Sequence, residues 1–221
     1  MMRTIWFRTV TSALSVVLAA YAVSGIFAER MRPPFRIADF FRDETRPTIT
    51  EDKWSAKVAF VSIDGGILSD YAALKSRQAL ATSPDNSASR AAANRQAQDA
   101  ARWALTASPV NSSMWLILAL LKTQMDEPTA ASLKMSYFTG PVGQDALALR
   151  IRTLATTSAV VDEDIRLLAQ TDIRTVLTRY PRLEPSLAAT YRQAPPDGKK
   201  FLLDATQAAD PKFSQLLRQY P

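Results

Sequence analysis

Two residue types are missing from this chain, namely cysteine and histidine. Without cysteine, the protein has no disulfide bonds, thiolate zinc sites or cysteine nucleophiles. Without histidine, it lacks the commonest general acid–base and the commonest metal ligand, and Ser–His and Cys–His catalytic arrangements are excluded. Any catalysis would have to rest on carboxylates, lysine or tyrosine.

Glycine is also scarce, with 6 residues in 221, whereas alanine and leucine are abundant. No run of four to eight residues alternates apolar and polar side chains between turn signals, as a half-buried strand would. Helices favour alanine and leucine and disfavour glycine. The composition therefore predicts an all-α fold.

Residues 9–28 contain no charged side chain and are mostly apolar. About 20 apolar residues in a helix match the thickness of the hydrocarbon core of a bilayer. We therefore expect an uncleaved signal anchor that spans the membrane once and contacts lipid through residues 9–28. The alternative is a signal peptide cleaved near Ala20-Tyr21-Ala22, although the apolar run continues beyond that point to Ile26 and Phe27.

Arginine flanks this segment on both sides, which bears on its orientation. Lys and Arg near the ends of a span set the orientation in the membrane. Arg3 and Arg8 favour an N-terminus inside the cell and an exported, periplasmic body. The other flank holds at least as many basic residues and would favour a body that faces anionic cytoplasmic lipids; they are Arg30, Arg32, Arg36 and Arg42.

The chain divides into three parts on this basis: residues 1–28 as anchor, 29–50 as a juxtamembrane linker, and 51–221 as a helical domain. Pro33-Pro34 favours an extended spacer. The linker is too apolar to be free, so we expect it to form a short helix that docks on the body or lies on the membrane. Docking is favoured, and the side chains concerned are Phe35, Ile37, Phe40 and Phe41.

Several helix starts are marked by caps. Asp210-Pro211 and Glu184-Pro185 each place proline near the first helical position. Asn111 precedes residues 114–121, an apolar run that we interpret as a helix buried on most sides. The acidic cluster Asp162-Glu163-Asp164 opens a helix whose buried stripe is expected to comprise Ile165, Leu168, Ala169, Ile173, Val176 and Tyr180.

A weak internal repeat follows from superposing Asp64 on Asn111, an offset of 47 residues, and a third block fits 32 residues later. Each block has a first helix, a turn and an apolar second helix. The pattern predicts antiparallel helical hairpins stacked side by side, with residues 82–94 as an insertion, part loop and part helix start.

Residues 101–121 carry the most specific part of this pattern: an alanine-bearing helix, a proline turn and an aromatic residue opening the next helix. In these features, at Ala104, Pro109, Trp115 and Ala119, the block resembles a tetratricopeptide repeat junction. The Trp-Leu-Gly signature of that family is absent. The resemblance implies a short array of helical hairpins that binds proteins and carries out no chemistry of its own.

Candidate catalytic and ligand-binding groups are few. The acidic clusters Glu51-Asp52 and Asp162-Glu163-Asp164 could serve a glycosidase or a hard cation, but helix capping explains both. Gly65-Gly66 is interpreted as a turn joining helices, and Asp197-Gly198-Lys199-Lys200 as a turn before a helix. Trp103 and Trp115 are expected in the core. We therefore assign no catalytic, cofactor or metal residues.

The net charge of +6 is spread along the chain without a dense basic run, which argues against nucleic-acid binding. The sequence favours a non-enzymatic scaffold at the bacterial inner membrane that binds partner proteins, in a setting such as surface-polysaccharide assembly. The partners are not identified, and no small-molecule substrate or cofactor is indicated. The alternatives are a carboxylate-dependent envelope enzyme acting on glycans and a cytoplasmic-facing lipid-binding adaptor.

Overall fold

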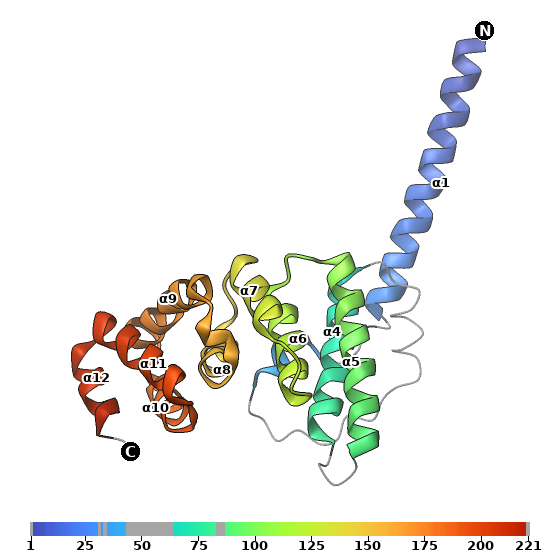
Figure 1. Cartoon of the computed structure of the whole chain (residues 1–221). Coiled ribbons are helices and arrows are strands. Elements are labelled where there is room, and N and C mark those ends of the chain that lie inside the picture. The colour runs from blue at the N-terminus through green and yellow to red at the C-terminus, as the bar shows by residue number, and fades with distance from the viewer. Residues whose placement is uncertain (1, 31, 33–34, 43–63, 83–86, 220–221) are drawn as a thin grey trace.

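The computed structural model describes residues 2–30, 32, 35–42, 64–82 and 87–219. These residues form helices and connecting turns, with no strand among them, so the all-α prediction is confirmed. A long first helix, α1 (Met2–Arg30), projects away from a body of packed helices (Figure 1). Glu51 and Asp52 lie outside the described residues. The division at residues 28 and 50 stays a prediction.

The body consists of consecutive helices joined by short turns. They are α4 (Gly65–Ala81), α5 (Ser87–Ala107), α6 (Ser112–Gln124), α7 (Ala130–Phe138), α8 (Gln144–Thr156), α9 (Glu163–Arg179), α10 (Glu184–Gln193), α11 (Pro196–Ala209) and α12 (Pro211–Arg218). One-turn 3₁₀ helices, η1 (Ser158–Val161) and η2 (Pro181–Leu183), precede α9 and α10.

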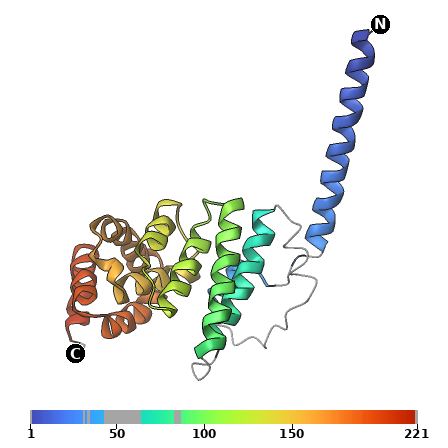
Figure 2. The same cartoon turned by 45° about the vertical axis from the view of Figure 1, so that its right-hand side comes forward.

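These helices form two rows. In one row α4, α6, α8 and α10 contact one another in succession, and in the other α7, α9 and α11 do so. Consecutive helices also pack together, α4 on α5, α5 on α6 and α6 on α7. Figure 2 shows the body extending sideways from α4 and α5 to the C-terminal helices. This packing of neighbours is compatible with a helical repeat fold.

The positions matched by the internal repeat have the same structural role. Asp64, Asn111 and Gly143 are the N-cap residues of α4, α6 and α8. The Asp64 carboxylate accepts hydrogen bonds from the backbone N–H groups of the first turn of α4, and the Asn111 side chain accepts one from Met114. The three second helices therefore begin at the positions that the two offsets predict.

The expected buried surfaces are largely confirmed. α6 buries most of its circumference, and the stripe of α9 is buried at Ile165, Ala169, Ile173 and Val176, with Leu168 and Tyr180 partly buried. The core consists of two clusters. One holds α4, α5 and most of α6, and the other holds α7 to α12, with Leu120 of α6 packed against both.

The helix start expected within residues 82–94 is found at Ser87, where α5 begins. Two other local predictions need correction. Gly65-Gly66 is no separate turn, because Asp64 is the N-cap of α4 and both glycines lie in the first turn of that helix. Residues 197–200 lie inside α11, because Pro196 already begins that helix.

α1 makes a 29-residue helix with its described apolar side chains exposed. They are Phe7, Val10, Leu14, Val16, Val17, Leu18, Tyr21, Val23 and Ile26. Among the residues that the structure describes, no helix meets the length and hydropathy required to cross a membrane, so the span expected over residues 9–28 is not found.

Candidate functional site

The segment that follows α1 docks on the body. Phe35 and Phe40 are buried in the N-terminal core cluster, and Phe41 is partly buried against both clusters. The short helix α2 (Ile37–Phe40) lies on α4, and the Arg77 guanidinium donates a hydrogen bond to the Phe40 carbonyl oxygen. Of the two sequence interpretations of this segment, docking on the body is therefore the one observed.

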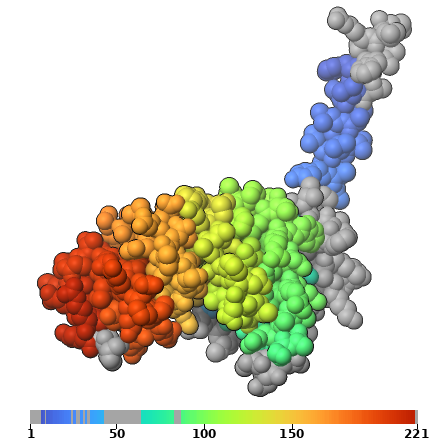
Figure 3. Space-filling view, in the orientation of Figure 1, coloured from blue at the N-terminus to red at the C-terminus, as the bar shows by residue number. Residues whose placement is uncertain are grey.

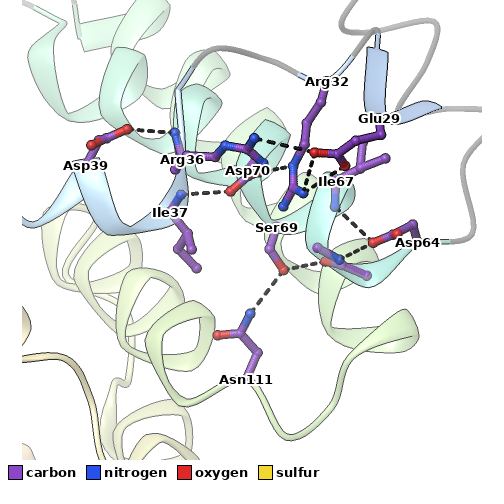
Figure 4. Close-up of polar contacts among 12 residues, drawn as sticks. Glu29, Arg32, Arg36, Ile37, Asp39, Asp64, Ile67, Ser69, Asp70 and Asn111 are labelled. Carbon is purple, nitrogen blue, oxygen red and sulfur yellow. Dashed lines mark hydrogen bonds and ion pairs between the residues drawn. The ribbon is translucent and has the colours of Figure 1, made fainter. Parts of the chain in front are cut away.

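A buried carboxylate holds this segment in place. Asp70, in the second turn of α4, has a side chain only 2% exposed. Its Oδ2 atom accepts a hydrogen bond from Arg32 Nε at 2.7 Å and one from Arg36 Nη1 at 3.3 Å. Its Oδ1 atom accepts a third from the Ile37 backbone N–H at 2.8 Å (Figure 4). We call this arrangement the Asp70 clasp.

The clasp also reaches α1. Arg32 Nη1 lies 3.0 Å from Glu29 Oε2, and Glu29 is in the last turn of α1. Arg32 therefore bridges a carboxylate of α1 and a carboxylate of α4. Burial lowers the pKa of Arg32, but hydrogen bonds and attraction from Asp70 and Glu29 outweigh this effect, so that the net pKa is raised above its ordinary value.

On its other side the first turn of α4 is tied to the turn between α5 and α6. Asn111 Nδ2 donates a hydrogen bond to Ser69 Oγ at 3.1 Å, as Figure 4 shows. Gly65 packs so closely on this turn that a Cβ there would come within 2.8 Å of Ser108 Cβ. The end of α1, the clasp and the α5–α6 turn are therefore linked by direct contacts.

A second buried ion pair lies in the C-terminal half. Arg150 of α8 donates two hydrogen bonds to Asp172 of α9, and its Nη1 donates to the carbonyl oxygens of Ser136 and Gly140. The guanidinium lies 4.2 Å from the centroid of the Tyr137 ring. Burial raises the pKa of Asp172 and Arg150 opposes the rise, while burial and the nearby Asp172 charge raise the pKa of Tyr137. All the guanidinium nitrogens are thus held by protein atoms.

The acidic cluster before α9 has a capping role, as expected. Asp162 Oδ1 accepts hydrogen bonds from the N–H groups of Asp164 and Ile165, and Lys134 Nζ lies 3.3 Å from Asp162 Oδ2 and 2.6 Å from Asp164 Oδ2. Partial desolvation acts to raise the pKa of Asp162, but these hydrogen bonds and Lys134 lower it overall. A proton-donating carboxyl would need the opposite shift.

The two tryptophans expected in the core lie at its edge. Trp103 and Trp115 are each partly buried against the N-terminal cluster. Trp115 Nε1 donates a hydrogen bond to the Pro109 carbonyl oxygen at 2.8 Å, which braces the α5–α6 turn. In the described part of the chain, no three carboxylates gather closely enough to hold a metal ion.

The buried charges were missed by sequence reasoning, although a signal for them exists. Asp172 follows Ile165 and Ala169 at helical spacing and so lies on the buried stripe of α9, and Asp70 lies between Ile67 and Leu74 on α4 in the same way. A carboxylate on an apolar stripe indicates a buried cation partner. Which arginine fills that role depends on tertiary contacts between residues 22 and 38 positions apart.

Comparison of the chain with protein-family models, with curated proteins and with solved structures gave no match.

Proposed function

We propose that this protein is a membrane-attached helical scaffold, in which α1 holds the body at a bilayer and the body binds partner proteins. The observation that carries the proposal is that α1 stands clear of the body with its large apolar side chains exposed (Figure 1). Exposed apolar surface of this extent is costly in water and favourable in lipid.

The polar groups of α1 support a lipid environment. Between Arg8 and Glu29 the helix has no charged residue. The Thr11 hydroxyl donates to the Phe7 carbonyl oxygen at 2.8 Å, and the Ser15 hydroxyl donates to the Thr11 carbonyl oxygen at 2.9 Å. Hydroxyl groups bonded within their own helix need no water, which is the condition that a hydrocarbon environment imposes.

The body supports the scaffold part of the proposal. Its two rows of helices form an extended surface, the usual basis of partner binding by helical arrays. The charged side chains that might have served chemistry are engaged in structure: Asp70 and Asp172 bind arginines, and Asp162 caps α9. A glycan-acting enzyme with Asp162 in its cleft requires a raised pKa at this residue. The pKa of Asp162 is instead lowered.

The cellular setting extends the proposal. Attachment of α1 at the bacterial inner membrane with a periplasmic body is the version that Arg3 and Arg8 favour, and envelope or polysaccharide assembly is a suitable context. The rival lipid-binding adaptor relies on free arginines next to the membrane. Arg32 and Arg36 instead bind Asp70, which weakens that rival.

Membrane attachment is tested with the full chain carrying alkaline phosphatase after Pro221, followed by fractionation and alkaline carbonate extraction. The proposal expects phosphatase activity in the carbonate-resistant membrane fraction. In a Val17→Arg and Leu18→Arg variant, the charges should release the protein into the extract. Arg174→Lys, at an exposed position of α9, is the matched control and should fractionate as the parent does. Active phosphatase in the soluble fraction of the parent would contradict attachment.

Partner binding is tested in the same cells by placing a photo-crosslinking amino acid at exposed positions in each row, such as Arg152 of α8 and Arg174 of α9. A scaffold should give the same discrete crosslinked proteins from neighbouring positions of one row. Crosslinks that arise only from α1 would contradict a partner-binding body.

A further inference from the structure

The side of the body toward which α1 projects exposes large apolar side chains at the α5–α6 turn and at the end of α7. Val110, at the tip of the α5–α6 turn, is 71% exposed, and Phe138, the last residue of α7, is 60% exposed. Met135, one turn before Phe138, is 37% exposed. We call Val110, Met135 and Phe138 the apolar rim. Figure 3 shows that the helices ending in this region form one continuous surface of the body.

The turn that carries Val110 is rigidly built. The Asn111 N–H donates to the Ser108 carbonyl oxygen at 3.2 Å, which places Pro109 and Val110 in the two central positions of a β-turn. Trp115 braces the Pro109 carbonyl oxygen. Polar residues and glycine usually occupy the third position of such a turn. The turn therefore holds a β-branched apolar side chain out in solvent without any local structural reason.

Hydrogen bonds connect the two elements that carry the rim. The Ser136 hydroxyl donates to the Ser112 carbonyl oxygen, and the Ser112 hydroxyl donates to the Pro141 carbonyl oxygen, both at 2.9 Å. The start of α6 and the end of α7 therefore lie side by side. Contacts of Gly65 and Asn111 link the same turn to the Asp70 clasp and so to the base of α1.

In Figures 1 and 2, α1 projects from beside α4 and α5 toward the same side of the body as the α5–α6 turn and the end of α7. The helix α12 lies at the far end of the body. A bilayer entered by α1 therefore passes over the rim and leaves α12 in water. Arg32 holds the base of α1 to α4, so this relation does not depend on a free linker.

We propose that the apolar rim inserts into the headgroup region of the bilayer to which α1 attaches, so that the body lies against the membrane on this edge. The inference rests on the proposed membrane attachment. Side chains such as valine and phenylalanine gain by burial ~5–10 Å into the boundary between headgroups and acyl chains. Trp115, partly buried beside the turn, is of the type that concentrates at this depth.

The absence of cysteine from the chain allows a clean test. Single variants Val110→Cys, Phe138→Cys, Leu18→Cys and Leu216→Cys of the full chain each carry one environment-sensitive fluorophore, in vesicles of phosphatidylethanolamine and phosphatidylglycerol. Leu216, 44% exposed on α12, is the matched control for an exposed apolar residue far from the rim. Bromine atoms at shallow or deep positions of the lipid chains then report the depth of each fluorophore by quenching.

The proposal expects the fluorophores at positions 110 and 138 to shift to the blue and to be quenched more by shallow than by deep bromines, and that at position 216 to be unaffected. Quenching at position 18 with none at 110 and 138 overturns the rim and leaves membrane attachment intact. A blue shift at 110 and 138 without quenching identifies a protein contact and also overturns it. No quenching at position 18 contradicts the attachment itself.

Discussion

Arg150 and Asp172 form a two-point ion pair inside the C-terminal core, with Nε 2.7 Å from Oδ2 and Nη2 2.8 Å from Oδ1. The pair joins α8 to α9. Both partners were taken out of water, so the pair itself adds little net stability, but its orientation fixes how the two helices meet.

Removing one charged side chain of this pair should destabilise the protein far more than replacing both with apolar side chains. Arg150→Met or Asp172→Leu alone leaves a buried charge and should lower the free energy of unfolding by roughly 3–5 kcal/mol. The double variant should recover most of that loss. The measurement is urea unfolding of the full chain in one detergent, followed by circular dichroism. Losses that simply add in the double variant would show that the two side chains act independently.

Gly198 should not tolerate a side chain. A Cβ at this position of α11 would overlap the Ala155 carbonyl oxygen at the end of α8. We expect Gly198→Ala to cost at least ~1–3 kcal/mol, because the two helices must move apart. In Gly143→Ser, the control, the added Cβ meets no atom within 4 Å and the hydroxyl can cap α8, so stability should be retained. Equal melting temperatures for both variants would contradict close packing at Gly198.

Asp70→Asn should loosen the segment after α1 without unfolding the body. The amide keeps the shape of the carboxylate but removes the charge that Arg32 and Arg36 share, a loss of roughly 1.5–3 kcal/mol for a hydrogen bond to a charged group. Hydrogen exchange should accelerate at Ile37, whose N–H donates to Asp70, and over the neighbouring residues 35–42. Asp99→Asn, which breaks the exposed pair with Arg102, is the control and should leave that exchange unchanged.

Asp162 should make the protein less stable in acid. Its folded pKa is lowered below the ordinary 3.8, so the unfolded chain takes up the proton first. The contribution of Asp162 is therefore complete above the unfolded value and is lost as the pH falls through the folded value. Asp162→Ser keeps a cap but does not titrate. The stability difference between parent and variant, measured across this range, should shrink toward low pH; a constant difference would contradict the prediction.

Much of the fold could be predicted because local signals agree with the tertiary structure. Caps at Asn111, Asp162 and Asp210 mark helix starts, and the two repeat offsets align Asp64, Asn111 and Gly143 as N-caps. Each cap depends only on residues within one turn of it. Leu216 shows the limit: it lies next to the buried Leu217 on α12, yet it is 44% exposed, because which side chains of an apolar helix are covered depends on the helices packed around it.

The Asp70 clasp could be predicted only in part. The aromatic side chains of residues 35–41 indicate docking, and Phe35 and Phe40 are indeed buried. The sequence does not indicate which anion the arginines of the same segment bind, because both lipid phosphates and a buried carboxylate attract arginine. Only the path of the chain, which brings residues 32 and 70 together, distinguishes the two.

The bridge from Glu29 through Arg32 to Asp70 limits how far the body can move from the end of α1. A free 22-residue tether over residues 29–50 would let the body explore roughly 25 Å from its anchor point. With the bridge closed, that slack is removed at the base of α1, and under the proposed attachment of α1 to a bilayer the body would meet only what diffuses to it in the plane of that bilayer. A tether shortened in this way raises the effective concentration toward neighbours in the same membrane and lowers it toward anything held farther away.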